Sequence, residues 1–143
     1  MNAREFLEQY LRKTEQIEAL QDKIAEIRAC AEKCTSVLRP TPGGIAHNDS
    51  RLEQLVVKID SMEQQLGILW EERGRIYIET VSLLCDISDE RCRQVLEKRY
   101  LESETFKAIE EDLYISAAHV YRLHNRGLEL AEHLLKMRVE ESA

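Results

Sequence analysis

The stretch that decides the fold is residues 105–126, which read TFKAIEEDLYISAAHVYRLHNR. Its first half predicts a short helix, because three large apolar side chains recur at spacings of three and four residues and so share one face. These side chains are Phe106, Ile109 and Leu113. Thr105 or Ser103 can cap the start of this helix with a hydroxyl group.

A second, longer helix is predicted to follow a tight turn. Tyr114 and Ile115 leave the helical pattern, and Ser116 can accept hydrogen bonds from the amides that follow it, as an N-cap residue does. At 100° per residue the inward positions are Val120, Leu123, His124, Gly127, Ala131, Leu134 and Leu135, and the outward ones are Ala118, Arg122, Asn125 and Glu129. Two helices joined in this way indicate a helix-turn-helix, and DNA is the first partner to expect.

The outward side of this second helix begins with small residues and then becomes basic, and no carboxylate occurs from Ser116 to Leu128. Arginine can contact phosphates, and arginine or asparagine can read base edges. The candidate DNA-binding residues are Ser116, Ala118, His119, Tyr121, Arg122, Asn125 and Arg126, with Lys107 from the first helix. His124 is left out, because its inward direction is typical of a hydrogen-bonded core histidine.

This region resembles region four of bacterial sigma factors. The resemblance rests on LEKRYL at 96–101, on YRLHNR at 121–126, and on Ile109, Leu113, Ser116 and Val120 between them. It is closest to small regulators of phages and mobile elements, the ArpU/RinA-type late transcription regulators and a related uncharacterised phage family. In those proteins a sigma-like C-terminal domain follows a long helical segment. The resemblance implies transcription control, with the second helix of the motif in the major groove.

Two positions depart from the usual pattern of such motifs. Glu110 stands where a small residue commonly lets the two helices cross closely, so its carboxylate must reach solvent or find a partner. Tyr114 stands where glycine is common, and it is strained if the backbone there needs a positive φ.

The net charge of the chain is −7, although non-specific DNA-binding proteins are usually basic. DNA binding is therefore expected to depend on a local patch of Arg122, Arg126, His119 and Lys107, assisted by dimerisation or by RNA polymerase. The acidic remainder could itself face a basic partner.

Residues 86–101 predict one more helix of the same domain. Ser88 can cap it, acidic residues follow in its first turn, and Val95, Leu96 and Tyr100 can face a core. We therefore expect a helix-turn-helix domain over residues 87–143, with its three helices within 87–137.

The first 86 residues show heptad repeats instead, which predict a coiled-coil-like antiparallel helical hairpin. One seam contains Tyr10, Ile17, Ile24, Ala31 and Leu38 at a, with Phe6, Lys13, Leu20, Ile27 and Cys34 at d. The other contains Leu52, Ile59, Leu66, Arg73 and Thr80 at a, with Leu55, Met62, Leu69, Ile76 and Leu83 at d. Two prolines and two glycines between the seams predict a loop at 39–50. Leu38 would then lie near Leu52, and Phe6 near Leu83.

A second apolar flank, formed by Ile68, Trp70, Tyr77 and Ile78, lies outside the strict seam. Packing against residues 88–137 explains it as well as a homodimer interface does. A two-fold dimer would present two reading helices to a pseudo-palindromic site.

Several classes are not favoured by the sequence. It has no Gly-rich phosphate loop, no motif of histidines and carboxylates at metal-binding spacing, and no recognisable pair of nucleophile and base. We therefore expect no enzyme and no cofactor. Its four cysteines are expected to be free thiols, because the hairpin would separate Cys34 from Cys85 by roughly 45 Å. Without a signal peptide or a long apolar run, the all-α protein is expected to be cytoplasmic, with no membrane role.

The sequence is consistent with three hypotheses of function. The first is a sigma-region-four-like transcription regulator whose hairpin dimerises or holds RNA polymerase. The second is a DNA-packaging protein similar to a phage terminase small subunit, which ring-like oligomers would distinguish. The third is an adaptor with a degenerate helix-turn-helix that binds only protein.

Overall fold

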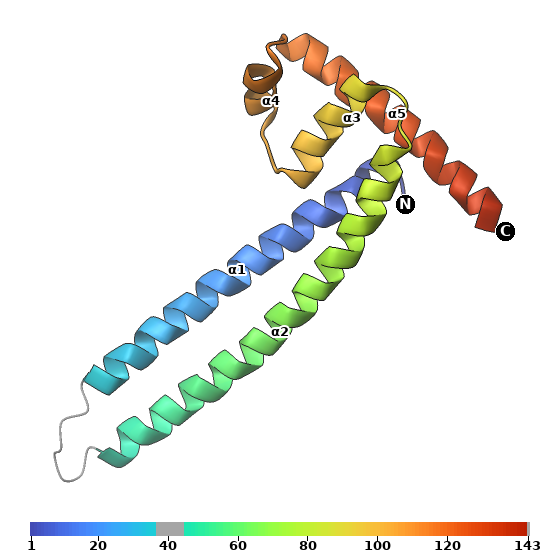
Figure 1. The fold of residues 1–143 in the computed structure, drawn as a ribbon. Helices are drawn as coiled ribbons and strands as arrows, with labels where there is room; N and C mark the ends of the chain where they lie inside the picture. The colour runs from blue at the N-terminus through green and yellow to red at the C-terminus, as the bar shows by residue number, and fades with distance from the viewer. Residues whose placement is uncertain (37–44, 143) are drawn as a thin grey trace. The chain divides into compact units, whose positions relative to one another are not determined.

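The computed structural model of the protein describes residues 1–36 and 45–142. Within these ranges the chain forms helices joined by short turns and contains no strand, which confirms the all-α class. The helices are α1 (Ala3–Ser36), α2 (Ile45–Cys85), α3 (Glu90–Leu96) with its π-helical continuation η1 (Glu97–Leu101), α4 (Phe106–Leu113) and α5 (Ala117–Ser142) (Figure 1).

The helices contribute to two compact units. The first unit contains residues 1–13 and 73–143, and the second contains residues 14–72. This division differs from the predicted boundary between residues 86 and 87. Its physical cause is a shared core, because Leu7 of α1 and Leu83 and Leu84 of α2 are buried in one cluster with Leu96 of α3 and Ala131 of α5. Phe6 is partly buried and packs against this cluster, which contains Leu83, the residue that the heptads predicted to lie near it.

The start of α1 is anchored inside the first unit by hydrogen bonds to its first amides. Asn2 Oδ1 accepts from the Glu5 amide at 2.8 Å, and Glu5 Oε2 accepts from the Asn2 amide at 3.2 Å. This reciprocal pair has the geometry of a capping box. Glu132 of α5 accepts from the Ala3 amide at 2.6 Å, and Ala3 is buried. The chain start is therefore held by α5 as well as by its own cap.

The second unit consists of parts of α1 and α2 that lie side by side and run in opposite directions (Figure 1). Ile17 and Ile24 of α1 are buried against Met62 and Leu66 of α2. Leu20, Ile27, Ile59 and Leu69 pack around them and are partly buried. All eight positions belong to the predicted a and d seams.

The predicted loop at 39–50 is too long at its C-terminal end, because residues 45–50 belong to α2. The prolines and glycines that favoured a loop all precede Ile45, and no residue from 45 to 50 forbids helical backbone. The rest of the predicted loop, 39–44, and the predicted neighbour of Leu52, Leu38, lie outside the described residues.

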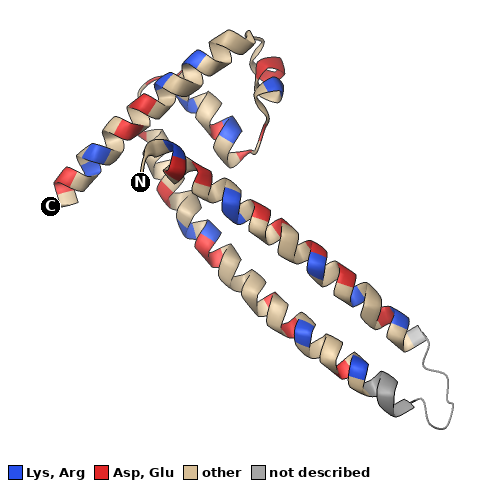
Figure 2. Ribbon diagram, turned by 180° about the vertical axis from the view of Figure 1, so that it is seen from behind, with Lys and Arg blue, Asp and Glu red and all other residues tan. Residues whose placement is uncertain are grey.

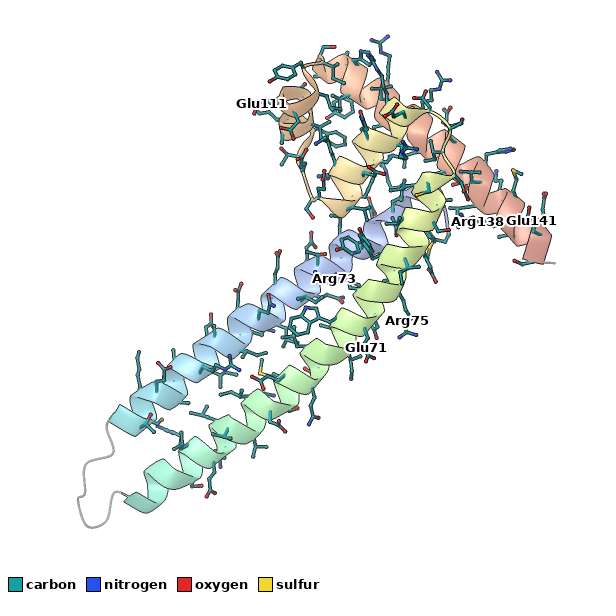
Figure 3. The ribbon with its side chains drawn as sticks, in the orientation of Figure 1. Glu71, Arg73, Arg75, Glu111, Arg138 and Glu141 are labelled. Atoms are coloured by element: carbon teal, nitrogen blue, oxygen red, sulfur yellow. The ribbon has the colours of Figure 1, made fainter. Side chains whose placement is uncertain are left out.

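Polar seam positions of the first unit have local partners. The guanidinium carbon of Arg73, labelled in Figure 3, lies 5.8 Å from the ring centroid of Tyr10 on α1. Tyr10 also contacts Tyr77, with ring centroids 5.7 Å apart. The hydroxyl group of the fully buried Thr80 donates to the Ile76 carbonyl at 2.7 Å. Intrahelical bonding and a ring face therefore let the seam tolerate polar residues.

Candidate nucleic-acid interface

Helix α3 is the support on which the candidate interface is built. Its N-cap is Asp89, whose carboxylate accepts from the amides of Arg91 at 3.1 Å and Cys92 at 3.3 Å. The prediction that Ser88 caps this helix is therefore wrong by one residue. Asp89 has the extended backbone of an N-cap. The hydrogen bond from the Cys92 amide is the largest influence on the pKa of the Asp89 carboxyl group and lowers it.

Helix α4 begins at a cap that the sequence predicted. Thr105 Oγ1 accepts from the Ala108 amide at 3.1 Å. The alternative cap, Ser103, has a left-handed backbone with φ 58° and so does not form the extended cap. The side chain of Glu110 is partly exposed, which gives its carboxylate access to solvent at the position where a small residue was expected.

The turn after α4 reverses the chain through a left-handed residue. Tyr114 has φ 54° and ψ 44°, and its amide donates to the Glu110 carbonyl. The Ile115 amide donates to the same carbonyl at 3.3 Å. Tyr114 therefore adopts the conformation that glycine usually supplies, and its side chain is 95% exposed.

Helix α5 starts at the predicted residue and buries the predicted face. Ser116 Oγ accepts from the His119 amide at 3.3 Å. The buried residues of α5 are Val120, His124, Gly127 and Ala131, and the partly buried Leu123, Leu134 and Leu135 flank them. Val120, Ile109 of α4 and Val95 of α3 form one fully buried cluster. This cluster holds the start of α5 against the other two helices.

The middle of α5 approaches α3 closely at Gly127. A Cβ atom placed there would lie 2.9 Å from Leu96 Cδ1 and 3.5 Å from Cys92 Cβ. Both neighbours are completely buried. Burial raises the pKa of the Cys92 thiol to about 11, so this cysteine is protonated and unreactive at neutral pH.

His124 is a core residue, as its direction in the helix predicted. It is 2% exposed, and its Nε2 atom lies 2.8 Å from the Tyr100 hydroxyl oxygen. The Phe106 ring meets it edge-on at a centroid distance of 5.1 Å. Burial lowers the pKa of His124, so the neutral ring is favoured.

The candidate residues lie on the opposite side of α5. Ser116, Ala118, Tyr121, Arg122, Asn125 and Arg126 are exposed, His119 is partly exposed, and Lys107 is exposed on α4. Figure 2 shows basic positions in the part of α5 nearest to α4 and acidic positions only farther along the helix. We call the surface formed by these eight residues the α5 face.

Aromatic stacking sets the position of one member of the α5 face. Tyr121 is 51% exposed, and its ring stacks on Phe106 with centroids 4.9 Å apart. The guanidinium carbon of Arg99 lies 4.9 Å from the Phe106 centroid. A partly buried phenyl ring from α4 therefore supports the Tyr121 ring, which reduces its freedom before any ligand binds.

Acidic groups close to the α5 face modify its charge. Arg126 Nε lies 3.8 Å from Asp89 Oδ2, although the Arg126 side chain is 68% exposed. On α4, Glu111 projects into solvent, as labelled in Figure 3, and Asp112 Oδ2 lies 3.5 Å from Lys98 Nζ. Sequence reasoning missed the role of Asp89, because the pair joins residues far apart in the chain and no local periodicity relates them.

Comparison with models of protein families, with curated protein sequences and with solved structures finds no match to the chain.

In the part of the chain that the structure describes, no group of three or more His, Cys, Asp or Glu side chains is placed to hold a metal ion. Cys30, Cys34, Cys85 and Cys92 are free thiols. None of the described helices combines the length and apolar character that crossing a membrane requires.

Proposed function

We propose that the protein is a DNA-binding transcription regulator of a phage or integrated mobile element. In this proposal α4 and α5 are a helix-turn-helix, α5 enters the major groove, and residues 1–86 form a hairpin that dimerises or holds RNA polymerase. The observation that carries the proposal is the α5 face: an exposed, carboxylate-free start of a long helix, anchored from behind by Val95, Ile109 and Val120. The resemblance to sigma region four supports the same role.

The size and chemistry of the α5 face suit a duplex groove. An α-helix with its side chains is about 10–12 Å wide, which matches a major groove about 12 Å wide. Ala117 and Ala118 are exposed, and their small side chains keep the N-terminal end of α5 narrow. Arg122 and Asn125 follow on the outward side, where a guanidinium group can bind guanine or phosphate and an amide can bind adenine.

The overall charge limits the affinity that this face can provide alone. The chain carries −7, so binding gains nothing from a general attraction to phosphate. Only a few cations are available, and Asp89 neutralises part of the charge of Arg126. We therefore propose that the full affinity requires two copies of the face or a second protein on the promoter.

A specific observation also favours the adaptor hypothesis. Glu111 and Asp112 are exposed on α4, the helix that leads into the turn. Lys98 offsets part of the charge of Asp112, but the two carboxylates would still repel a phosphate backbone that approached them. A protein partner with a basic surface would instead be attracted to them. The terminase-like alternative keeps DNA as the ligand and differs by its ring-like assembly.

The proposal can be tested by selecting bound duplexes from a random DNA library and measuring their affinity by fluorescence anisotropy. Arg122→Ala is expected to weaken binding by about 1–3 kcal/mol, because a bidentate base contact is lost. Arg75→Ala is the matched control: it removes the same charge from an exposed position on α2, labelled in Figure 3, and should leave affinity unchanged. Circular dichroism confirms that both variants are folded.

A second variant tests the charge balance of the α5 face. Asp89→Asn keeps an oxygen acceptor for the cap of α3 but removes the negative charge beside Arg126. It is therefore expected to strengthen DNA binding at low salt. If no duplex is enriched, or if Arg122→Ala behaves like Arg75→Ala, DNA recognition by the α5 face is refuted and the adaptor hypothesis takes its place.

A further inference from the structure

A groove with both apolar and charged side chains runs between α1 and α2 in the second unit, on one side of the heptad seam. Its volume is about 690 Å³. Ala25, Arg28 and Ala29 of α1 and Glu63, Leu66 and Trp70 of α2 are among the residues that line it. Trp70 is 46% exposed, although the adjoining Leu66 is buried. We call this side of the second unit the Trp70 groove.

The second unit leaves much of its apolar surface without cover. Its described buried residues are Ile17, Ile24, Met62 and Leu66, which lie along the single seam. Large apolar side chains outside that seam remain in water, with Val57 68% and Val56 54% exposed. A layer of two helices has solvent on both faces, so covering one face requires another layer.

We propose that the Trp70 groove is a dimerisation surface and that its occupant is the same groove of a second copy of this chain. The groove contains both parts of a reciprocal contact. Trp70 is a large, half-exposed ring, and Ala25 and Ala29 are exposed, lie one helical turn apart and leave space above α1. Each Trp70 would fill the space above the two alanines of the other copy.

The spacing along the helices permits this exchange. Arg28 and Glu63 form an ion pair, which sets the level at which α1 faces α2. Trp70 is seven residues beyond Glu63, or about 10 Å along α2 at 1.5 Å per residue. It therefore lies toward one end of the groove and Ala29 toward the other. A two-fold axis between them brings each ring to the alanines of the other copy.

Charge and area are also compatible with self-association. The rim contains both signs, Arg28 with Glu32 and Glu63, so placing it against itself does not oppose like charges alone. Residues 14–36 of α1 extend about 35 Å, and two adjacent helices are about 20 Å wide, giving a footprint of roughly 700 Å². Specific interfaces bury about 600–1,000 Å² per partner, a range that includes this footprint. One face of the second unit is therefore large enough for a specific dimer.

The opposite face provides a matched control. Its groove is smaller, about 440 Å³, and Leu20 and Lys23 of α1 and Ile68 and Leu69 of α2 are among the residues that line it. Ile68 is 58% exposed there. The Ile68→Arg substitution adds the same charge to the same unit without entering the Trp70 groove.

This inference rests on the proposed function, in which the hairpin can dimerise. The experiment uses the full chain without DNA, so a failure to dimerise is distinguishable from a failure to bind DNA. Trp70 is the single tryptophan of the sequence, and its fluorescence therefore reports on this groove alone. Between nanomolar and high micromolar concentration we expect a blue shift of the emission and weaker quenching by iodide. Sedimentation velocity should show monomer changing to dimer over the same range.

The Ala29→Arg variant tests the geometry while keeping the fluorescent probe. Ala29 is exposed in a helix, so arginine is expected to leave the monomer folded, as circular dichroism can verify. It should raise the dimer Kd at least about tenfold, because the arginine fills the space above α1 that the Trp70 ring of the other copy would occupy. Ile68→Arg should not change the Kd. A monomer at every concentration, or equal effects of the two arginine variants, would overturn the proposal.

Discussion

At the scale of single residues, Tyr114 is the position at which local preference and the required backbone disagree. Its φ of 54° ends α4 and permits the turn into α5, and its side chain is 95% exposed. A side chain with a Cβ atom is disfavoured in this conformation by about 1–2 kcal/mol, and exposure leaves the ring little packing to compensate. The native residue therefore stabilises the turn less than glycine would.

Tyr114→Gly is expected to raise the free energy of unfolding by about 1 kcal/mol, because it removes the left-handed strain and loses little packing. Tyr114→Ala keeps the Cβ atom and should show no comparable gain. Thermal or urea unfolding of the three proteins measures the difference. If both variants were less stable than the native protein, the exposed ring would be shown to stabilise the fold, and a glycine variant no more stable than the alanine variant would contradict the left-handed strain.

At the scale of helices, the crossing of α3 and α5 depends on the absence of a side chain at Gly127. A Cβ atom there would lie 2.9 Å from Leu96 Cδ1 and 3.0 Å from Leu96 Cγ, inside a core where Leu96 and Cys92 are completely buried. Gly74 provides the contrast: it lies on the exposed side of α2, and an added Cβ atom would meet nothing within 4 Å.

These two glycines should respond oppositely to alanine. Gly74→Ala is expected to stabilise the protein by about 0.5–1 kcal/mol, since alanine is the better helix former. Gly127→Ala gains the same propensity but forces the core apart, which typically costs about 1–3 kcal/mol, so the net effect is destabilising. Chemical unfolding curves measure both. Stabilisation by Gly127→Ala would mean that the Leu96 side chain or the two helices can shift without a loss of packing.

At the scale of the whole molecule, stability depends on a titratable group in the core of the first unit. Burial is the largest influence on His124 and lowers its pKa; the Asn125 side chain opposes this shift, and the positive charges of Arg4 and Arg99 add to it. His124 is also hydrogen-bonded to Tyr100. In the unfolded chain its pKa returns to about 6.5. Below that value the unfolded state takes up a proton that the folded state does not.

The stability contributed by neutral His124 should therefore be complete above pH 7 and be lost as the pH falls below about 6.5, until the folded pKa is reached. The slope can reach about 1.4 kcal/mol per pH unit. His124→Gln does not titrate and can still bond Tyr100, so its stability should vary less between pH 7.5 and 5.5. Equal pH dependence of the two proteins would contradict this origin.

Local patterns predicted the helices and the directions of their side chains. The seam positions, the inward face of α5, the cap at Thr105 and the core position of His124 follow from spacing and residue type, which act within one or two turns of a helix. The eight predicted contact residues come from the same periodicity, and their DNA binding stays a prediction.

Only the tertiary structure decided which distant segments share a core. It placed the start of α1 and the end of α2 with α3 and α5, and it paired Arg126 with Asp89. A heptad pattern specifies which face of a helix is buried, but it does not specify along what length of that face each of the other helices packs. That length depends on contacts between residues far apart in the chain, which no local period encodes.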